Sequence, residues 1–217
     1  LLSFLSFMPG VFLFFFKNVE NVQEDSLKEG NIRNLKFIVL QPRFLQAITA
    51  AAFAYAVMSF LMTATPLSMH VMENMSLKET GLVLQFHVVA MFLPSLITGN
   101  LIKKYGHSAI IYGGVLFFFI TVLISLFEQT YLNYMLSLIF LGLGWNFLFI
   151  SGTSLVVLTY NKEEKFKVQG INDLIVFSTM ALASLSAGIL LNSIGWKMMN
   201  LICCLLYTSP SPRDSSE

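Results

Sequence analysis

The sequence predicts an all-α polytopic membrane protein, and three observations support this fold class. Apolar residues make up 56% of the 217-residue chain and charged residues only 12%, whereas a soluble domain usually carries about 25% charged residues. Several stretches with almost no charge reach the roughly 20 residues that a helix needs to cross a bilayer core. Between these stretches the basic residues gather in alternate loops, which is typical of a chain that crosses a membrane repeatedly. The net charge of +1 gives no reason to expect a nucleic-acid partner.

The first two segments are predicted to be a partial membrane helix and a polar linker. Residues 1–16 are apolar and lack both a basic leader and a small-residue cleavage site, which favours the end of a membrane helix over a secretory signal. Because the sequence opens inside this apolar run, we expect the chain to be a fragment. Residues 17–42 mix acidic and basic side chains and are too polar for a core, so they are expected to form a solvated linker.

Three predicted spans follow the linker. Residues 43–65 form the first, which Pro66 closes. Residues 80–102 form the second, and Pro94 within it predicts a kink. Residues 107–127 form the third, which consists almost entirely of Ile, Leu, Phe and Gly. Because polar groups are costly in lipid, we expect this apolar span at the periphery and the more polar spans around an interior.

The longest uncharged stretch, residues 131–160, is the predicted fourth span and holds several polar residues in its middle. Residues 169–192, rich in Ala, Ser and Gly, form the fifth, and residues 196–206 begin a truncated sixth. The transmembrane bundle is therefore expected over residues 43–204. Residues 205–217 switch abruptly to Ser, Pro and charged residues, so we expect a non-native tail there.

The basic residues set the predicted orientation of these spans. The loops on one side hold only Lys78 and Lys197. The linker side holds ten basic residues, which are Lys17, Lys28, Arg33, Lys36, Arg43, Lys103, Lys104, Lys162, Lys165 and Lys167. Under the positive-inside rule, the linker side is expected to be cytoplasmic.

Six spans that follow a charged cytoplasmic linker and the end of another span resemble the C-terminal half of a major facilitator superfamily transporter. The runs MTATPLSMH, QFHVVAMFLPSLITG, GLGWNFLFISGTS and KVQGINDLIVF also resemble a group of bacterial permeases of this family. The resemblance covers residues 1 to about 204. It implies a bacterial inner-membrane protein with a second, N-terminal half and a transport site between the halves. It also implies that the third and sixth of the six predicted spans lie on the outside.

A short loop carries a partial match to a motif of the same family. The run GNLIKKYGH resembles the loop motif Gly-x-x-x-Asp-Arg-x-Gly-Arg and matches it at Gly99, Lys104 and Gly106, with Lys104 in place of Arg. Lys103 stands where the motif has its acidic residue, so the chain departs from the motif at that position. The loop follows the second span of the half, which agrees with the resemblance.

Two ionisable residues inside the predicted spans are candidates for proton coupling or gating. Asp173 lies about five residues, or ~7 Å, into its span, and an acid at such a depth suggests coupling or a gate contact with the other half. The alternative is an acid stabilised by the positive end of the helix macrodipole. His87 could accept a coupled proton near neutral pH, or it could be a histidine that is hydrogen-bonded inside the bundle.

Four residues are candidates for substrate binding. Asn146 could hydrogen-bond a polar solute, and Trp145 could stack on a ring. The alternative for Asn146 is a hydrogen bond that ties one helix to the next, worth about 1 kcal/mol. Gln85 is a further polar residue in the second span, and Thr153 shares a helical face with Gly142 and Asn146. We expect this face to point inward.

These residues favour a secondary transporter that moves a small organic solute by alternating access, with proton coupling inferred from His87 and Asp173. One alternative is a membrane-embedded enzyme, which would need a nucleophile–base pair such as Ser151 or Ser154 with His87. Another is a structural or signalling membrane subunit, which would not need polar helix faces. The sequence shows no nucleotide-binding motif and no metal-ligand spacing, so no cofactor, metal site or direct use of ATP is predicted.

Overall fold

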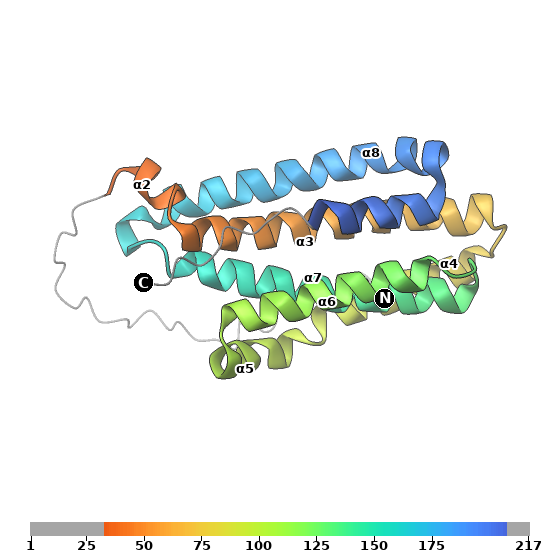
Figure 1. Cartoon of the computed structure of the whole chain (residues 1–217), viewed down its shortest axis with the longest axis horizontal. Coiled ribbons are helices and arrows are strands. Elements are labelled where there is room, and N and C mark those ends of the chain that lie inside the picture. The colour runs from red at the N-terminus through yellow and green to blue at the C-terminus, as the bar shows by residue number, and fades with distance from the viewer. Residues whose placement is uncertain (1–32, 208–217) are drawn as a thin grey trace, which may run out of the picture. The chain divides into compact units, whose positions relative to one another are not determined.

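The computed structural model describes residues 33–207, with side chains as far as Cys203, and all statements on the fold refer to this range. Within it the chain forms helices and no strand (Figure 1), so the predicted all-α fold class is confirmed for these residues. The elements in order are α2 (Leu35–Val39), α3 (Pro42–Pro66), the π-helix η1 (Leu67–Met72), α4 (Leu77–Phe92), α5 (Ser95–Tyr105), α6 (His107–Ser125), α7 (Tyr131–Val157), the 3₁₀-helix η2 (Lys162–Glu164) and α8 (Lys165–Tyr207). The predicted partial helix at residues 1–16, the first part of the linker and residues 208–217 of the predicted tail lie outside the described residues.

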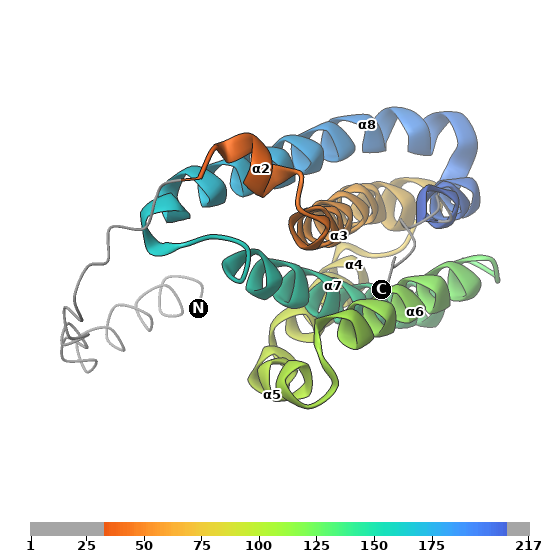
Figure 2. The same ribbon diagram turned by 60° about the vertical axis from the view of Figure 1, so that its left-hand side comes forward.

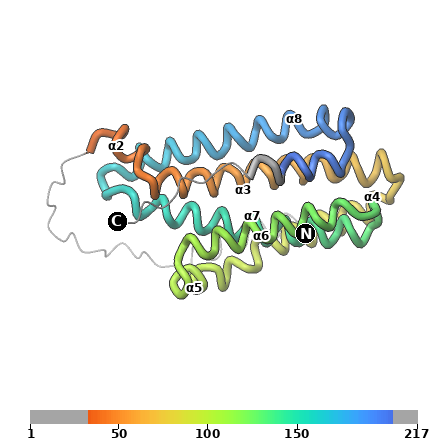
Figure 3. Tube along the Cα trace, viewed as in Figure 1, coloured from red at the N-terminus to blue at the C-terminus, as the bar shows by residue number. Residues whose placement is uncertain are grey.

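Five segments of the described range are long and apolar enough to cross a membrane. They are Pro42–Met72, Leu77–Tyr105, His107–Ser125, Tyr131–Val157 and Lys162–Cys203. The last of them contains two helices, because the backbone leaves the helical conformation at Gly195, where φ is 74° and ψ is 170°. A positive φ favours glycine. The chain reverses direction there, as Figure 3 shows, so α8 contributes two antiparallel helices to the bundle.

Local sequence signals set several helix ends. At the start of α4 the Glu79 amide donates to Ser76 Oγ over 3.2 Å, and the Ser76 amide donates to the Glu79 carboxylate over 2.9 Å, which is a capping box. Thr130 Oγ1 accepts a hydrogen bond from the amide of Asn133 over 3.3 Å and so caps α7. Between α5 and α6, Gly106 adopts a φ of 83°, which permits the sharp turn.

Helix α7 is the centre of the bundle, and its glycines bring neighbouring helices close to it. A Cβ atom at Gly142 would lie 2.8 Å from the carbonyl oxygen of His87 in α4. A Cβ atom at Gly152 would lie 2.8 Å from the carbonyl oxygen of Ala47 in α3, and Gly144 faces α6 equally closely. Small residues let helix backbones approach one another in a membrane. Helix α7 accordingly lies between α3 and α6 in both Figure 1 and Figure 2.

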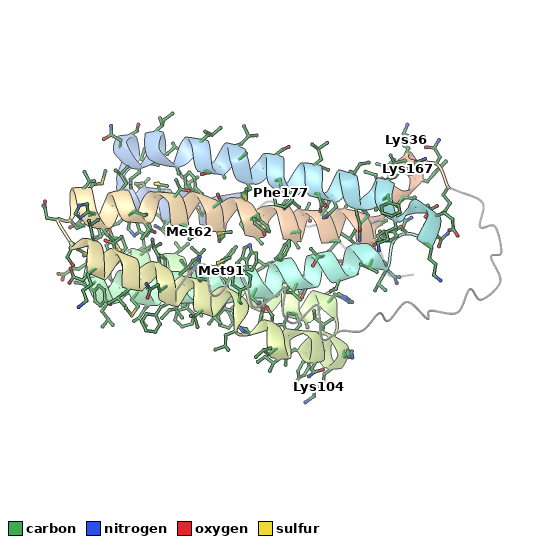
Figure 4. All side chains as sticks on the ribbon, turned by 180° about the vertical axis from the view of Figure 1, so that it is seen from behind. Lys36, Met62, Met91, Lys104, Lys167 and Phe177 are labelled. Atoms are coloured by element: carbon green, nitrogen blue, oxygen red, sulfur yellow. The ribbon has the colours of Figure 1, made fainter. Side chains whose placement is uncertain are left out.

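The two broad sides of the bundle are formed by different helices. In Figure 1, α6 and the helix that follows Gly195 lie in front, whereas α4 lies in front in the view from behind (Figure 4). On α6 an apolar stripe formed by Tyr112, Leu116, Phe119 and Leu123 is exposed. Its spacing places these side chains on one helix face. Outward-facing apolar side chains of this kind indicate contact with lipid, so α6 belongs to the outer wall of the bundle.

The predicted second span consists of two helices in the structure. Helix α4 ends at Phe92 and α5 begins at Ser95, with Leu93 and Pro94 between them. Proline lacks the N–H that would continue the helix, and its ring clashes with the preceding turn. The break therefore lies where Pro94 predicts a kink. Near the break the carbonyl oxygen of Met91 accepts a hydrogen bond from a side chain of α7.

One buried carboxylate holds the segment before α3 against the α7–α8 loop. The Glu164 side chain is only 2% exposed, and its oxygens accept hydrogen bonds from Arg33 Nε, Nη2 and the Arg33 amide over 3.0, 2.7 and 2.9 Å. The amide of Asn161 donates to the same carboxylate, and Arg33 Nη2 also donates to the carbonyl oxygen of Thr159. Ile38 of α2 is buried in an adjoining apolar cluster. The end of the predicted linker therefore packs onto the bundle.

Glu164→Gln is expected to loosen this attachment. Glutamine keeps the shape of the side chain but loses the charge, and a hydrogen bond to a charged group contributes about 1.5–3 kcal/mol. Because the Arg33 side chain is 40% exposed, we expect a loss of only about 1–2 kcal/mol. Trypsin cleavage after Lys36 should become several times faster. Glu163→Gln, at the exposed neighbour, is the matched control, and equal cleavage rates in the two variants would contradict the attachment.

Candidate functional site

Five aromatic side chains from four helices meet in what we call the aromatic cluster. Its members are Tyr55 of α3, Phe92 of α4, Trp145 and Phe149 of α7, and Phe177 of α8. Trp145 and Phe149 are stacked, with ring centroids 4.9 Å apart and an interplanar angle of 19°. Tyr55 meets Trp145 edge-on at 5.3 Å and Phe149 at 4.8 Å. Phe92 lies 5.9 Å from Trp145, and Phe177 lies 5.9 Å from Tyr55. Such pairs contribute about 0.5–1.5 kcal/mol each beyond their buried area.

The aromatic cluster lies near the middle of the helix bundle and is open along one edge. Tyr55 and Trp145 lie near the middle of their helices, and Phe177 lies near the middle of the part of α8 before Gly195. Figure 4 labels Phe177 on the side of the bundle where α4 is in front. Trp145 is 3% exposed, whereas Phe92 and Phe177 are 59% and 51% exposed. The cluster thus has a buried base and an accessible edge.

Asn146 holds the break between α4 and α5. Its Nδ2 donates to the carbonyl oxygen of Met91 over 2.7 Å and to Ser95 Oγ over 2.6 Å. Its Oδ1 accepts from Thr98 Oγ1 over 2.6 Å, and the whole residue is buried. Gly142, on the same face of α7, packs against α4. These contacts are the ones expected if Asn146 ties one helix to the next. A role of Asn146 in substrate binding stays a prediction.

His87 is buried between α4 and α7. Its Nδ1 lies 2.7 Å from the carbonyl oxygen of Leu138. Because a carbonyl oxygen can only accept, Nδ1 carries a proton in this contact. Nε2 is buried without a hydrogen-bond partner among the described residues. In neutral His87 this nitrogen is the atom that can accept a further proton.

Gln85, Thr153 and Asp173 do not come together with His87 in one site. Gln85 is exposed on α4. Thr153 is half-buried, and its hydroxyl group donates to backbone carbonyl oxygens of its own helix. Asp173 is exposed on α8, and its Oδ1 accepts a hydrogen bond from Asn172 Nδ2 over 3.1 Å. Their predicted roles in binding, coupling and gating stay predictions.

The residues of the family-like loop motif lie in α5 and in the α5–α6 turn. Gly99 is exposed, and a Cβ atom there would meet nothing within 4 Å. Lys104 Nζ lies 5.0 Å from the centre of the Tyr105 ring, a cation–π distance. Gly106 supplies the positive φ of the turn. Of the three matched residues, Gly106 is therefore the one whose backbone conformation favours glycine.

A second candidate site is an apolar cavity of about 140 Å³ between α3, α6, α7 and the helix after Gly195. Its lining includes Phe53, Val57, Phe118, Leu141 and Cys203. The lining offers a solute almost no hydrogen-bonding group, and sites for small molecules usually have a few such groups. Among residues 33–203, no group of three or more His, Cys, Asp or Glu side chains is placed to hold a metal ion.

Four rings of the aromatic cluster were missed by sequence reasoning, which named only Trp145. In a membrane helix, aromatic residues such as Phe92 or Phe177 are indistinguishable from lipid-facing or packing residues. Their meeting depends on how four helices pack, and one sequence does not show that. The available signal was position, since an aromatic residue occurs near the middle of α3, of α7 and of the first part of α8, and Phe92 lies near the middle of the apolar segment Leu77–Tyr105.

The family profile described as "Major Facilitator Superfamily" matches residues 47–208, which include most of α3 and all later helices. The chain belongs to the Major Facilitator Superfamily. It is therefore an integral membrane protein with the helix bundle of that superfamily.

Two curated relatives of the chain agree with its assignment to the superfamily. It is 41% identical over 168 residues to "Riboflavin transporter RfnT" of Brucella anthropi, which covers 77% of this chain and 42% of that protein. It is 28% identical over 188 residues to "Uncharacterized MFS-type transporter YdeG" of Bacillus subtilis, which covers 86% of this chain and 44% of that protein. The chain thus spans less than half the length of these two relatives.

Proposed function

We propose that this chain is the C-terminal half of a secondary active transporter, which moves a small organic solute by alternating access. The observation that carries the proposal is the aromatic cluster, because its rings lie near the middle of apolar segments that are long enough to cross a membrane. Transporter sites lie near the bilayer midplane between two repeats that rock against each other. Superfamily membership supports transport. The chain spans less than half the length of its two relatives, which supports an additional N-terminal half.

The proposed transporter lies in a bacterial inner membrane with its linker on the cytoplasmic side. Figure 4 places the labelled Lys36, Lys104 and Lys167 toward the same end of the bundle, where α3 begins and α7 is joined to α8. Clustering of basic residues on one side supports a cytoplasmic location of that end.

The proposed solute is riboflavin or a close chemical relative. Support comes from the relative named as a riboflavin transporter and from the aromatic cluster, since flat rings stack on aromatic side chains. The test is uptake of labelled riboflavin by vesicles that contain the full-length protein. We expect saturable uptake that unlabelled riboflavin inhibits. Uptake no greater than that of protein-free vesicles would reject riboflavin as the solute.

A membrane-embedded hydrolase is not part of the proposal. The hydrolase alternative needs His87 close to a serine nucleophile such as Ser151. His87 contacts Leu138, and Ser151 lies 13 residues further along the same helix. At 1.5 Å per residue this separation is about 20 Å, so the pair does not form in this arrangement.

We further propose that His87 couples transport to protons through its unpartnered Nε2. His87→Gln retains an amide that can donate to the Leu138 carbonyl oxygen but cannot bind a proton between about pH 6 and 8. Stimulation of uptake by an imposed proton gradient should fall about tenfold, whereas exchange without a gradient should persist. His70→Gln, at an exposed residue of η1, is the control. Undiminished stimulation in His87→Gln would contradict proton coupling through this residue.

A further inference from the structure

Asp173 and Phe177 lie one helical turn apart on the same face of α8. Side chains four residues apart on a helix are neighbours, and both of these are exposed. Phe177 in turn approaches Tyr55 at 5.9 Å. The open edge of the aromatic cluster therefore has a carboxylate beside it.

The carboxylate of Asp173 is suited to accept hydrogen bonds from a ligand. In the structure one of its oxygens accepts from Asn172 Nδ2. An ionised carboxylate has about four acceptor positions and no donor. Its natural partners are hydroxyl groups, while a negatively charged substituent would be repelled. Asp173 thus favours a neutral substituent that carries hydroxyl groups.

The open edge of the aromatic cluster is suited to a flat conjugated ring. Phe92 and Phe177 are each more than half exposed, although their rings contact other rings of the cluster. A flat ligand ring that covers them would gain the same stacked and edge-on contacts that hold the cluster together. An aliphatic solute of equal size could not make these contacts.

The base of the aromatic cluster also carries an unsatisfied hydrogen-bond donor. Trp145 Nε1 is buried and has no acceptor among the described residues. An unpaired buried donor costs about 1–3 kcal/mol, so binding of a ligand atom that accepts from it would be favoured. Carbonyl oxygens and ring nitrogens at the edge of a heteroaromatic ring are such acceptors.

We infer that the aromatic cluster and Asp173 together form a two-part binding site for a neutral heteroaromatic solute with a hydroxyl-bearing side chain. The ring lies against Phe92, Phe177 and Tyr55, and the hydroxyl groups donate to Asp173. The inference rests on the proposed function. It adds an assignment of particular residues to the ring and to the hydroxyl groups of the solute. It also makes Asp173 a residue that selects against phosphorylated forms of the same solute.

The test uses vesicles with the full-length protein and four probes: riboflavin, lumichrome (the ring without the polyol), ribitol (the polyol without nitrogen rings) and flavin mononucleotide. Lumichrome should compete with riboflavin uptake, and ribitol should not. Phe177→Leu should raise both the riboflavin KM and the lumichrome inhibition constant about three- to tenfold. Asp173→Asn should raise the riboflavin KM about tenfold, leave lumichrome inhibition within about twofold, and reduce discrimination against flavin mononucleotide.

Phe127→Leu is the matched control, because Phe127 is 68% exposed directly after α6 and is not among the residues of the aromatic cluster or of the cavity lining. If riboflavin is taken up but Phe177→Leu behaves like Phe127→Leu, the binding site is wrong and the proposed function stands. If riboflavin is not taken up, the proposed solute is wrong, and the ring site is judged by lumichrome binding to the purified full-length protein. Binding that Phe177→Leu weakens and Phe127→Leu does not would support the ring site. No lumichrome binding would overturn it.

Discussion

Gly142→Val is expected to prevent α4 from packing against α7. A Cβ atom at this position would lie 2.8 Å from the carbonyl oxygen of His87 and 3.1 Å from the amide nitrogen of Met91. Both are backbone atoms, so no rotamer change can relieve the overlap and the helices must separate. Overpacking of this kind costs about 1–3 kcal/mol, and more where the backbone must move. The full-length protein should show a lower midpoint of thermal unfolding and a smaller monodisperse fraction in detergent.

Gly81→Val is the control for Gly142→Val. Gly81 lies in α4, and a Cβ atom there would meet nothing within 4 Å. This variant should unfold within a few degrees of the wild-type protein. Gly142→Ala should fall between the wild-type protein and Gly142→Val, because it adds the first clashing atom alone. Equal unfolding midpoints for Gly81→Val and Gly142→Val would show that the approach of α4 to α7 is not tight.

The long uncharged stretch that stood out in the sequence is α7, the helix at the centre of the bundle. Its length, its lack of charge and the alternation of basic loops were enough to predict a membrane-spanning helix. Pro94 likewise marked the place where α4 gives way to α5, because the missing N–H is a local property. Such features could be predicted because each depends on a few neighbouring residues.

The neighbours of the polar residues in α7 could not be predicted in the same way. In a membrane helix the lipid-facing side and the packed side are both largely apolar. The periodicity of apolar residues therefore does not show which side faces a cavity and which side packs against another helix. Gly142 and Asn146 share the face that was expected to point inward, and both contact α4 or the α4–α5 break. Binding a solute and tying two helices together both require a hydrogen-bonding residue such as Asn146. The residue type therefore did not distinguish these roles, and the contacts became visible only in the fold.

The attachment of Arg33 to Glu164 was also invisible in the sequence. The two residues are 131 positions apart, and each lies in a segment whose charge is typical of solvated loops. An ion pair leaves no spacing signal when its partners come from different loops. The aromatic cluster could not be predicted for the same reason, since its rings come from four helices. Only Trp145 was a candidate residue in the sequence.

Asn146→Leu is expected to disturb the junction of α4 and α5 and to reduce transport. Leucine has the same branching and number of heavy atoms but makes no hydrogen bond, so the carbonyl oxygen of Met91 and the hydroxyl group of Ser95 would lose their bonds to this side chain. A buried unsatisfied group costs about 1–3 kcal/mol, although measured values between membrane helices average about 0.6 kcal/mol. We therefore expect a modest fall in stability. Under the proposed function, riboflavin uptake should fall about tenfold, because these bonds fix how α5 continues from α4.

Ser154→Ala is the control for Asn146→Leu. Both changes remove a polar group from α7, but the Ser154 hydroxyl donates to a carbonyl oxygen of its own helix. Ser95→Ala removes one of the three hydrogen bonds of Asn146 and should give an intermediate loss of uptake. A graded series from Ser154→Ala through Ser95→Ala to Asn146→Leu would show that the bonds across the break, and not the polarity of α7, maintain transport. Wild-type uptake and unfolding in Asn146→Leu would show that the break holds its geometry without them.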